Sequence, residues 1–327
     1  MKKLKGIFSD KVKGKIGLEI HAYIITKEKL FCRCEASREK GLKENTLVCP
    51  ICTGQPGAKP MAPNESAVSK AVQIGLMLGC KINNVMKWQR KHYDWADMPK
   101  GYQNTLSGAG AVPVGVRGKF QGINIWSMHL EEDPASWNPE TGCVDYNRSG
   151  LPRVEIVTAP DFSTSKEVAE WLKKLIHNLS YLKAVDSNAG VKVDVNVNLA
   201  GEKKTERVEI KNVSSIEDIA RAVDYEIERQ GAEGSVKETR RFDEKKGVTI
   251  RMRGKEEAQD YRFISDPDLQ EIVIDGEFVS LIRRELPESP EEKLKKLVRS
   301  FKIGKIDALV LAKNIDIADF FEKVAEK

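Results

Sequence analysis

Apolar and polar residues alternate along six short segments of the chain, and each segment is predicted to form a β-strand. Successive side chains of a strand point to opposite faces of a sheet, so this alternation indicates one apolar and one polar face. A sheet with one covered face and one polar face is typical of antiparallel pairing. The six segments are residues 16–23, 122–130, 151–157, 191–199, 207–211 and 248–253.

Three further segments have the period of an amphipathic helix, and each begins at a residue that can cap a helix. The side-chain oxygen of Asn, Ser or Thr accepts a hydrogen bond from a free backbone N–H of the first turn. Strands that pair on one side of such helices predict an α+β fold with a mainly antiparallel sheet and flanking helices. The helical segments are predicted to begin at Asn64, at Thr164 or Ser165, and at Ser215, and to end at Gly79, Tyr181 and Arg229.

The last part of the chain differs from the rest because its pattern is purely helical. Pro287 and Pro290 interrupt the chain, and the residues after Glu291 keep the helical pattern. A length of 327 residues corresponds to about two folded units at roughly 150 residues each. We therefore predict a main domain over residues 1–286 and a short helical segment over residues 287–327.

Composition and charge are those of a soluble globular protein. The 40% apolar and 31% charged residues argue against fibrous and wholly disordered classes. The longest apolar runs, residues 74–78 and 308–312, are much shorter than the ~18 residues of a membrane-spanning helix. The basic N-terminus leads into no apolar segment, so no secretory signal and a cytoplasmic location are expected. The net charge of +5 permits an anionic partner without requiring one.

Four of the six cysteines lie within 21 positions of one another, in two close pairs. Two pairs on two turns can deliver four sulfur ligands to a tetrahedral zinc ion, and a closed site of four thiolates is normally structural. The alternative is a set of buried free thiols, but the charged neighbours Arg33 and Glu35 argue against a dry environment. We predict a zinc knuckle over residues 32–52, with Cys32, Cys34, Cys49 and Cys52 as ligands.

The polar faces of the predicted strands carry many acidic and basic side chains. Taken singly, each is typical of an ordinary solvent-exposed sheet face. Together, their carboxylates would repel one another unless cations gathered there, and carboxylate oxygens are the ligands that Mg²⁺ prefers. Such a face suits phosphoryl transfer, which needs metal ions and basic groups around the phosphates. The side chains are Glu19 and His21; His129 and Glu131, with Glu132 at the strand end; Asp194, Asn196 and Asn198; and Arg207, Glu209 and Lys211.

The usual nucleotide-binding loops are missing from the sequence. No phosphate-binding loop of the G-x-x-x-x-G-K-[ST] type occurs, and residues 108–113 have a proline where the third glycine of a dinucleotide fingerprint belongs. The segment with Lys100 and Tyr102 mixes cations with aromatic rings, which suits a base and a phosphate, although a solvated turn with packed tyrosines explains it equally well. Arg262 belongs to a charge-balanced set of residues from which one or two could contact phosphate.

In their order along the chain, these segments resemble the B subunits of the tRNA-dependent (aspartyl/glutamyl-tRNA) amidotransferases. The resemblance extends from about Lys15 to the last residue. The matching segments are GLEIH at 17–21, LFCRC at 30–34, VCPICTGQPG at 48–57, PKGYQ at 99–103, HLEED at 129–133, DYNRSG at 145–150, RVEIKN at 207–212 and DYR at 260–262.

The resemblance implies a catalytic cradle domain similar to the glutamine synthetase fold, then a helical domain and a tail domain that contacts tRNA. Residues 1–286 correspond to the cradle and 287–327 to the start of the helical domain, so no tail domain is expected within this sequence. The implied function, in protein biosynthesis, is ATP-dependent: the side-chain carboxylate of Asp or Glu on a mischarged tRNA is phosphorylated and then amidated to Asn or Gln. The implied partners are a glutaminase (amidase) subunit that supplies ammonia, a small stabilising subunit, and the mischarged tRNA.

The resemblance also assigns roles to individual residues. Mg²⁺ or Mn²⁺ would be held between ATP and the substrate carboxylate. The position of Lys211 on the polar face, rather than the resemblance, indicates that this residue would neutralise phosphate. Two alternatives from other classes are a non-catalytic, zinc-stapled tRNA-binding or assembly subunit and a metal-dependent hydrolase. The expected Mg²⁺ ligands are Glu19, His21, Glu131, Glu132 and Glu209, with Asp194 also in the catalytic set, and the expected nucleotide contacts are Lys100, Tyr102, Arg207 and Arg262.

Overall fold

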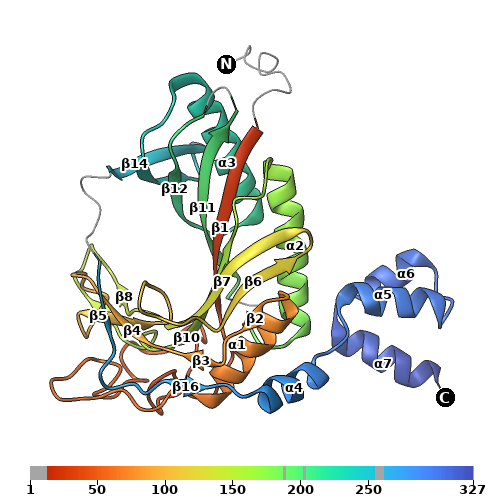
Figure 1. Cartoon of the computed structure of the whole chain (residues 1–327), viewed down its shortest axis with the longest axis horizontal. Helices are drawn as coiled ribbons and strands as arrows, with labels where there is room; N and C mark the ends of the chain where they lie inside the picture. Colours follow the sequence, from red (N-terminus) through yellow and green to blue (C-terminus); the bar gives the residue numbers. More distant parts are fainter. Residues whose placement is uncertain (1–12, 187–188, 202–203, 255–260, 327) are drawn as a thin grey trace.

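The computed structural model describes residues 13–186, 189–201, 204–254 and 261–326 (Figure 1). The strands are β1 (Lys13–Tyr23), β2 (Lys81–Ile82), β3 (Val85–Met86), β4 (Gln89–His92), β5 (Tyr102–Thr105), β6 (Gly115–Phe120), β7 (Ile123–Glu132), β8 (Ser136–Trp137), β9 (Val144–Asp145), β10 (Pro152–Thr158), β11 (Val191–Ala200), β12 (Val208–Val213), β13 (Glu238–Asp243), β14 (Val248–Gly254), β15 (Arg262–Ser265) and β16 (Ile272–Val273). The helices are α1 (Glu65–Met77), α2 (Ser165–Tyr181), α3 (Ile216–Glu233), α4 (Gly276–Glu285), α5 (Pro290–Arg299), α6 (Lys305–Leu311) and α7 (Ile315–Ala325).

Most strands belong to one sheet of 12 strands, which runs in the order β14-β13-β12-β11-β1-β10-β7-β5-β4-β15 with β6 and β2 attached through β7. Its described pairs are antiparallel except for β12 and β13, which are parallel. A parallel pair needs a crossover connection, and α3 supplies it between these two strands. The predicted α+β fold with a mainly antiparallel sheet is therefore confirmed.

The hydrophobic core lies between one face of this sheet and its helices. On β1, Leu18 and Ile20 are fully buried while Glu19 and His21 on the other face stay partly accessible. Figure 1 shows α2 running beside β1, and its Trp171 packs edge-on against Phe162 in the core. Because one face of the sheet is covered in this way, the polar side chains of its strands gather on the opposite face.

Local sequence signals account for the ends of the main helices. The side chains of Asn64, Thr164 and Ser215 each accept a hydrogen bond from the backbone N–H three residues later and so cap α1, α2 and α3. All six predicted strands are also present as β1, β7, β10, β11, β12 and β14. The sequence pattern thus located these nine elements, but it missed α4, although the side chain of Asp275 caps that helix in the same way.

Strands β4, β5, β13 and β15 were not predicted, because their polar side chains do not alternate with apolar ones. In β13, Arg240 is half-buried and donates to Glu238 Oε1 at 2.8 Å and to Thr249 Oγ1 at 2.8 Å. The Glu226 carboxylate, which is fully buried on α3, accepts from Thr249 Oγ1 at 2.8 Å. Ion pairs and hydrogen bonds therefore take the place of apolar contacts between α3 and this edge of the sheet.

The last three helices form a small core of their own, set apart from the sheet in Figure 1. Leu297, Ala308, Ala312 and Ala318 are its buried residues. The carbonyl oxygen of Ala312 accepts from Tyr181 Oη on α2 at 2.6 Å, which ties α6 to the main domain. None of the described helices combines the length and the apolar character needed to cross a membrane.

Replacing Lys293 by alanine is expected to destabilise α5–α7 by about 2 kcal/mol, because the buried Glu322 carboxylate loses one of its two charged hydrogen-bond donors and keeps only Lys296. Lys293 is 4% exposed, and its Nζ lies 2.8 Å from Glu288, 2.9 Å from Asp319 and 3.1 Å from Glu322. Hydrogen exchange of the amides in α5–α7 measures the change. The exposed Lys295, on the same helix, gives the matched control K295A, and equal protection in the two variants would contradict the expectation.

Candidate functional site

Strands β12, β11, β1, β10 and β7 bring their polar side chains together on one face of the sheet. Glu19 on β1 lies opposite Asp194 on β11, and His21 lies opposite Glu155 on β10. Arg153 on β10 lies opposite Glu131 on β7. Because side chains directly across an antiparallel pair are about 5 Å apart, this register builds two adjoining clusters of potential metal ligands.

The first cluster consists of Glu19, Asp194 and Glu209, whose oxygen atoms lie within 4.8 Å of one another. Lys211 joins two of these carboxylates, with Nζ 2.6 Å from Asp194 Oδ2 and 2.7 Å from Glu209 Oε1. The third, Glu19, accepts a hydrogen bond from the side-chain amide of Asn196 at 3.0 Å. Three carboxylates beside one ammonium group leave this cluster with a negative charge.

The pKa values of the two neighbouring acids Glu19 and Asp194 are shifted in opposite directions. Burial raises the pKa of Glu19, and the negative charge of Glu155 raises that pKa further. Burial is also the largest single effect on the pKa of Asp194 and acts to raise it, but the Lys211 ammonium and the hydrogen bond from the Asn212 backbone N–H, with smaller effects, together lower that pKa. Glu19 is therefore the carboxylate of this cluster that gains most from an additional cation.

The second cluster consists of His21, Glu131 and Glu155, again with ligand atoms within 4.8 Å of one another. Nδ1 of His21 is buried, lies 3.6 Å from Glu131 Oε1 and has no hydrogen-bond partner among the described residues. A buried ring nitrogen without a partner, flanked by two carboxylates, is a suitable donor set for a divalent cation. Because this nitrogen is unpaired and faces the two carboxylates, the three residues could hold a metal ion.

Arg153 lies inside the second cluster. Its Nε donates to Glu131 Oε1 at 2.8 Å, and its Nη1 donates to Asp133 Oδ1 at 3.0 Å. Burial is the largest single effect on the pKa of Glu131 and acts to raise it, but the Arg153 guanidinium, His21 and Lys91 together outweigh burial and hold that pKa well below its usual range. Glu131 is thus ionised, and part of its charge is already balanced by a cation of the chain itself.

Glu132 lies apart from both clusters, because it follows Glu131 on β7 and so points to the other face of that strand. Its carboxylate forms an ion pair with Lys100 and accepts from the backbone N–H of Asn104 at 2.8 Å. The Lys100 ammonium also lies 4.9 Å from the centroid of the Tyr102 ring. The structure therefore joins three predicted site residues, Glu132, Lys100 and Tyr102, in a separate group.

The remaining predicted residues are dispersed. Arg207 is exposed just before β12, Arg262 is exposed on β15 near the other end of the sheet, and neither pairs with a carboxylate within the described ranges. His129 shares the polar face, but its Nδ1 lies 2.8 Å from the carbonyl oxygen of Leu106 and its Nε2 lies 2.9 Å from Ser127 Oγ. Asp260, predicted as part of the same motif as Arg262, lies outside the described residues.

Sequence reasoning missed Arg153 and Glu155, although the segment containing them was predicted as a strand. Both alternate with the buried Val154 and Ile156 and therefore point to the polar face. The alternation of residues 151–157 therefore indicated that both side chains lie on the polar face, but neither was predicted as a site residue.

The four clustered cysteines form a third potential metal site. Their Sγ atoms all lie within 4.8 Å of one another, with Cys52 Sγ 4.0 Å from Cys34 Sγ and 3.9 Å from Cys49 Sγ. Tetrahedral zinc bound at about 2.3 Å would place its sulfur ligands about 3.8 Å apart. The cluster predicted from the cysteine spacing is therefore assembled and can hold a metal ion.

Lys29 is a part of this site that no sequence motif indicated. Its side chain is buried, and Nζ donates to Leu47 O at 2.8 Å and to Cys52 Sγ at 3.5 Å. A hydrogen bond from Cys32, together with the Lys29 charge, lowers the pKa of Cys52 to about 5. The buried ammonium thus favours the thiolate form that binds metals.

The cysteine loop also packs directly on the segment that carries Lys100. Gly54 has φ +67°, and a Cβ at this position would lie 2.5 Å from the carbonyl oxygen of Pro99. Only glycine allows this approach without displacing the backbone. The cysteine loop therefore packs directly against the backbone next to Lys100, the residue that pairs with Glu132.

Comparison with known proteins gives a consistent result. The GatB/GatE catalytic domain family matches residues 14–280. The B subunit of the aspartyl/glutamyl-tRNA(Asn/Gln) amidotransferase of Methanocaldococcus jannaschii is 46% identical over 96% of this chain and 67% of its own length. The protein of the same name from Methanothermobacter thermautotrophicus is 43% identical over 95% of this chain and 69% of its own length.

The matched residues include both carboxylate clusters and the four cysteines, and the chain spans about two thirds of the length of these relatives. By the extent of the match and the identity to its relatives, the chain is a member of the GatB/GatE catalytic domain family.

Proposed function

We propose that this chain activates the side-chain carboxylate of Asp or Glu on a mischarged tRNA with ATP and then lets ammonia displace the phosphate. One observation carries the proposal: two clusters of metal-ligand side chains adjoin on one polar sheet face, with Glu19 electrostatically coupled to Glu155 of the second cluster. The relatives named as amidotransferase B subunits support the same reaction class.

The reaction needs an activated acyl group, because a carboxylate is a poor acyl donor. A carboxylate oxygen of the substrate forms a bond to the γ-phosphorus of ATP, the bond to the β-phosphate oxygen breaks, and ADP leaves. The nitrogen of ammonia then forms a bond to the acyl carbon, inorganic phosphate leaves, and the amide nitrogen loses a proton. Asp-tRNA would yield Asn-tRNA, and Glu-tRNA would yield Gln-tRNA.

Residues of the two clusters would hold Mg²⁺ or Mn²⁺, which supplies charge neutralisation for the transferred phosphoryl group. Glu19, His21 and Glu131 are the first ligands in this proposal, with Glu155, Asp194 and Glu209 beside them. Lys211 and Arg153 orient the carboxylates with which they pair and add positive charge near the phosphates. Lys100 and Tyr102 contribute to the nucleotide site from the neighbouring group, while Arg207 and Arg262 would contact phosphates at its margins.

Zinc bound by Cys32, Cys34, Cys49 and Cys52 has a structural role in this proposal, because it leaves no open coordination position. Residues 1–286 form the catalytic cradle, and residues 287–327 begin the helical domain. Ammonia comes from a separate glutaminase subunit, and a small stabilising subunit completes the complex.

A second candidate function is a non-catalytic tRNA-binding or assembly subunit. The observation in its favour is that Arg153 and Lys211 already pair with carboxylates of the two clusters at 3.0 Å or less. These two cations balance part of the negative charge of the clusters without a metal ion, so the polar face could persist in a protein that has lost turnover.

An assay with ammonium in place of the glutaminase subunit separates the two candidates. The chain, alone and with partner subunits of a relative, is supplied with Mg²⁺, ATP and tRNA carrying either Asp or Glu. We expect ADP release that depends on the mischarged tRNA, and formation of Asn or Gln on that tRNA. Hydroxylamine should trap the acyl phosphate as a hydroxamate. Binding of tRNA without ADP release from either substrate would favour the non-catalytic subunit.

A further inference from the structure

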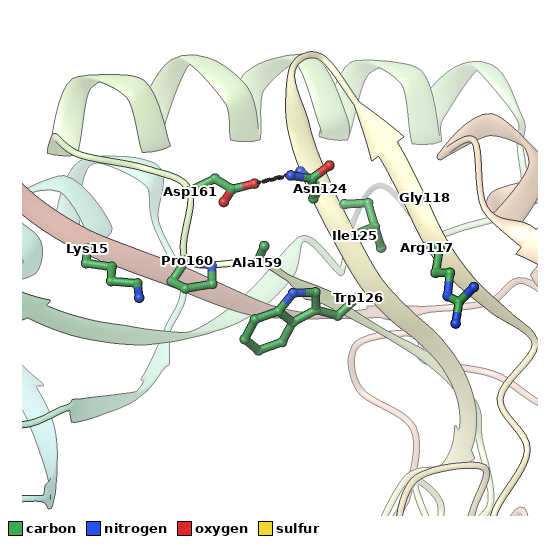
Figure 2. Close-up of a pocket in the computed structure, with 9 residues that line it drawn as sticks. All are labelled: Lys15, Arg117, Gly118, Asn124, Ile125, Trp126, Ala159, Pro160 and Asp161. Atoms are coloured by element: carbon green, nitrogen blue, oxygen red, sulfur yellow. Dashed lines mark hydrogen bonds between the residues drawn. The ribbon is translucent and has the colours of Figure 1, made fainter.

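A pocket of about 560 Å³ lies at the end of the polar sheet face, lined by residues of β1, β6 and β7 and of the segment that follows β10 (Figure 2). Its lining includes one exposed aromatic ring, Trp126, and two cations, Lys15 and Arg117. Figure 2 shows the Trp126 ring beneath the strands, with Lys15 and Arg117 on either side of it. None of these three residues belongs to the two carboxylate clusters or to the cysteine site.

A β-bulge places Trp126 in this pocket. On β7, Ser127 pairs with Val157 and Ile125 pairs with Thr158, so Trp126 is an extra residue between two partners that are adjacent on β10. A bulge redirects a side chain that regular alternation would place elsewhere. Ile125 remains buried in the core, whereas the Trp126 side chain is 59% exposed.

Arg117 lies beside the tryptophan because of the register between β6 and β7. Val116 pairs with Ser127 and Gly118 pairs with Ile125, which leaves Arg117 opposite Trp126. Side chains in such positions have Cβ atoms about 5 Å apart. Arg117 also has φ +53°, a conformation that is uncommon for a residue with a side chain.

Lys15 connects the pocket to the carboxylate clusters. It lies on β1 four residues before Glu19 and on the same face, so the two Cα atoms are about 13 Å apart at a rise of about 3.3 Å per residue. Pro160 lies between them, packed over Gly17 at 3.4 Å from the position of an added Cβ. Lys15 and Glu19 therefore lie on the same face of β1, on either side of the contact between Pro160 and Gly17.

The positive charges of this pocket are not balanced by the surrounding protein. Within the described residues, neither Lys15 nor Arg117 has a carboxylate at ion-pair distance. The one carboxylate in the lining, Asp161, accepts from the backbone N–H of Asn124 at 3.0 Å and from its side-chain amide at 2.8 Å. An exposed indole between two uncompensated cations is complementary to a planar base that carries phosphate.

We propose that the pocket binds a nucleotide, with the base stacked on Trp126 and the phosphate attracted by Lys15 and Arg117. This inference rests on the proposed function, because the reacting end of the bound nucleotide would extend along β1 to the carboxylate cluster that contains Glu19. Two sources supply this chemistry: the nucleoside triphosphate itself, or a nucleotide of the unpaired 3′ end of the tRNA. Both place a base at the pocket and a reacting group at the carboxylate clusters.

Equilibrium binding to the full chain tests the proposal with two separate probes. One is a non-hydrolysable ATP analogue with Mg²⁺, and the other is a short single-stranded RNA that ends in CCA. We expect W126A to weaken binding of at least one probe by about ten- to hundredfold, since loss of a base-stacking contact has an effect of this size. W126F should retain part of the affinity because it preserves a ring.

The control variant is W137A, which removes another partly exposed tryptophan, on β8 away from the pocket, and is expected to bind both probes normally. Thermal unfolding of each variant verifies that it is folded. A double K15Q and R117Q variant should bind with a shallower dependence on salt concentration, since fewer phosphate contacts release fewer counterions.

The two probes identify the source of the nucleotide. Loss of analogue binding alone assigns the pocket to the base of the triphosphate, and loss of RNA binding alone assigns it to the tRNA end. Unchanged affinity of W126A for both probes, or failure of the unmodified chain to bind either, overturns the proposal. Because no turnover is needed, a chain that binds but does not amidate contradicts the proposed function and leaves the nucleotide pocket in place.

Discussion

Replacing Glu19 by glutamine is expected to reduce amidation by at least about a hundredfold, because charge stabilisation by a bound metal ion contributes several kcal/mol to such reactions. Glu19 is the acid in its cluster whose pKa is raised, first by burial and then by the charge of Glu155. The amide preserves shape while removing the negative charge. It also relieves repulsion among the carboxylates, so stability should stay the same or increase.

Steady-state amidation at limiting and at saturating Mg²⁺, together with thermal unfolding, checks this result. The matched control is E170Q, the same chemical change on the solvent side of α2, where the Glu170 side chain is 63% exposed. The control should have full activity. A Glu19 variant that keeps full activity at limiting Mg²⁺ would show that the metal is bound elsewhere.

The four cysteines are predicted to bind one zinc ion per chain, and the double variant C49S/C52S is expected to bind none. Serine hydroxyls are poor zinc ligands, and the free energy of binding a structural zinc ion is part of the free energy of folding. Gly54 of this loop packs on Pro99, so the loss should also loosen the Lys100 segment. Elemental analysis of the purified chain gives the zinc content. The rate of proteolysis within residues 32–57 shows whether this loop is still folded.

Cys143 supplies the control for this experiment, because it is exposed and lies outside the cluster. C143S should keep one zinc ion and the protease resistance of the unmodified chain. Zinc content that stays at one ion per chain in the double variant would refute the assignment of the ligands.

The fold could be predicted where the sequence carries a regular period. The alternation around Leu18 and Ile20 gave β1, and the caps Asn64 and Ser215 gave the starts of α1 and α3. Strand β13 could not be found in this way, because its charged residues are stabilised by the buried Glu226 on α3, a contact that only the folded chain creates.

The same distinction applies to the candidate site. The spacing of the cysteines predicted their cluster, since short spacings limit how far the ligands can separate. Strand faces predicted Glu19, His21 and Glu131, but Glu132 points to the other side of β7 and pairs with Lys100. The buried Lys29 and the ion pair of Arg153 with Glu131 depend on neighbours more than 15 residues away in the sequence.

The sheet order has a consequence for how the chain is made and folded. Strand β1 comes first in the sequence, yet it pairs with β10 and β11. Glu19 can therefore reach its cross-strand partners only after Val157 and Asp194 have been synthesised. At a synthesis rate of about 5–20 residues per second, the first strand stays unpaired for roughly 7 to 27 seconds on the ribosome before β10 is complete. The cysteine loop can close within that time, because its ligands are all made early. A closed cysteine loop next to a strand that still lacks its partners is therefore the species that nascent-chain chaperones would meet.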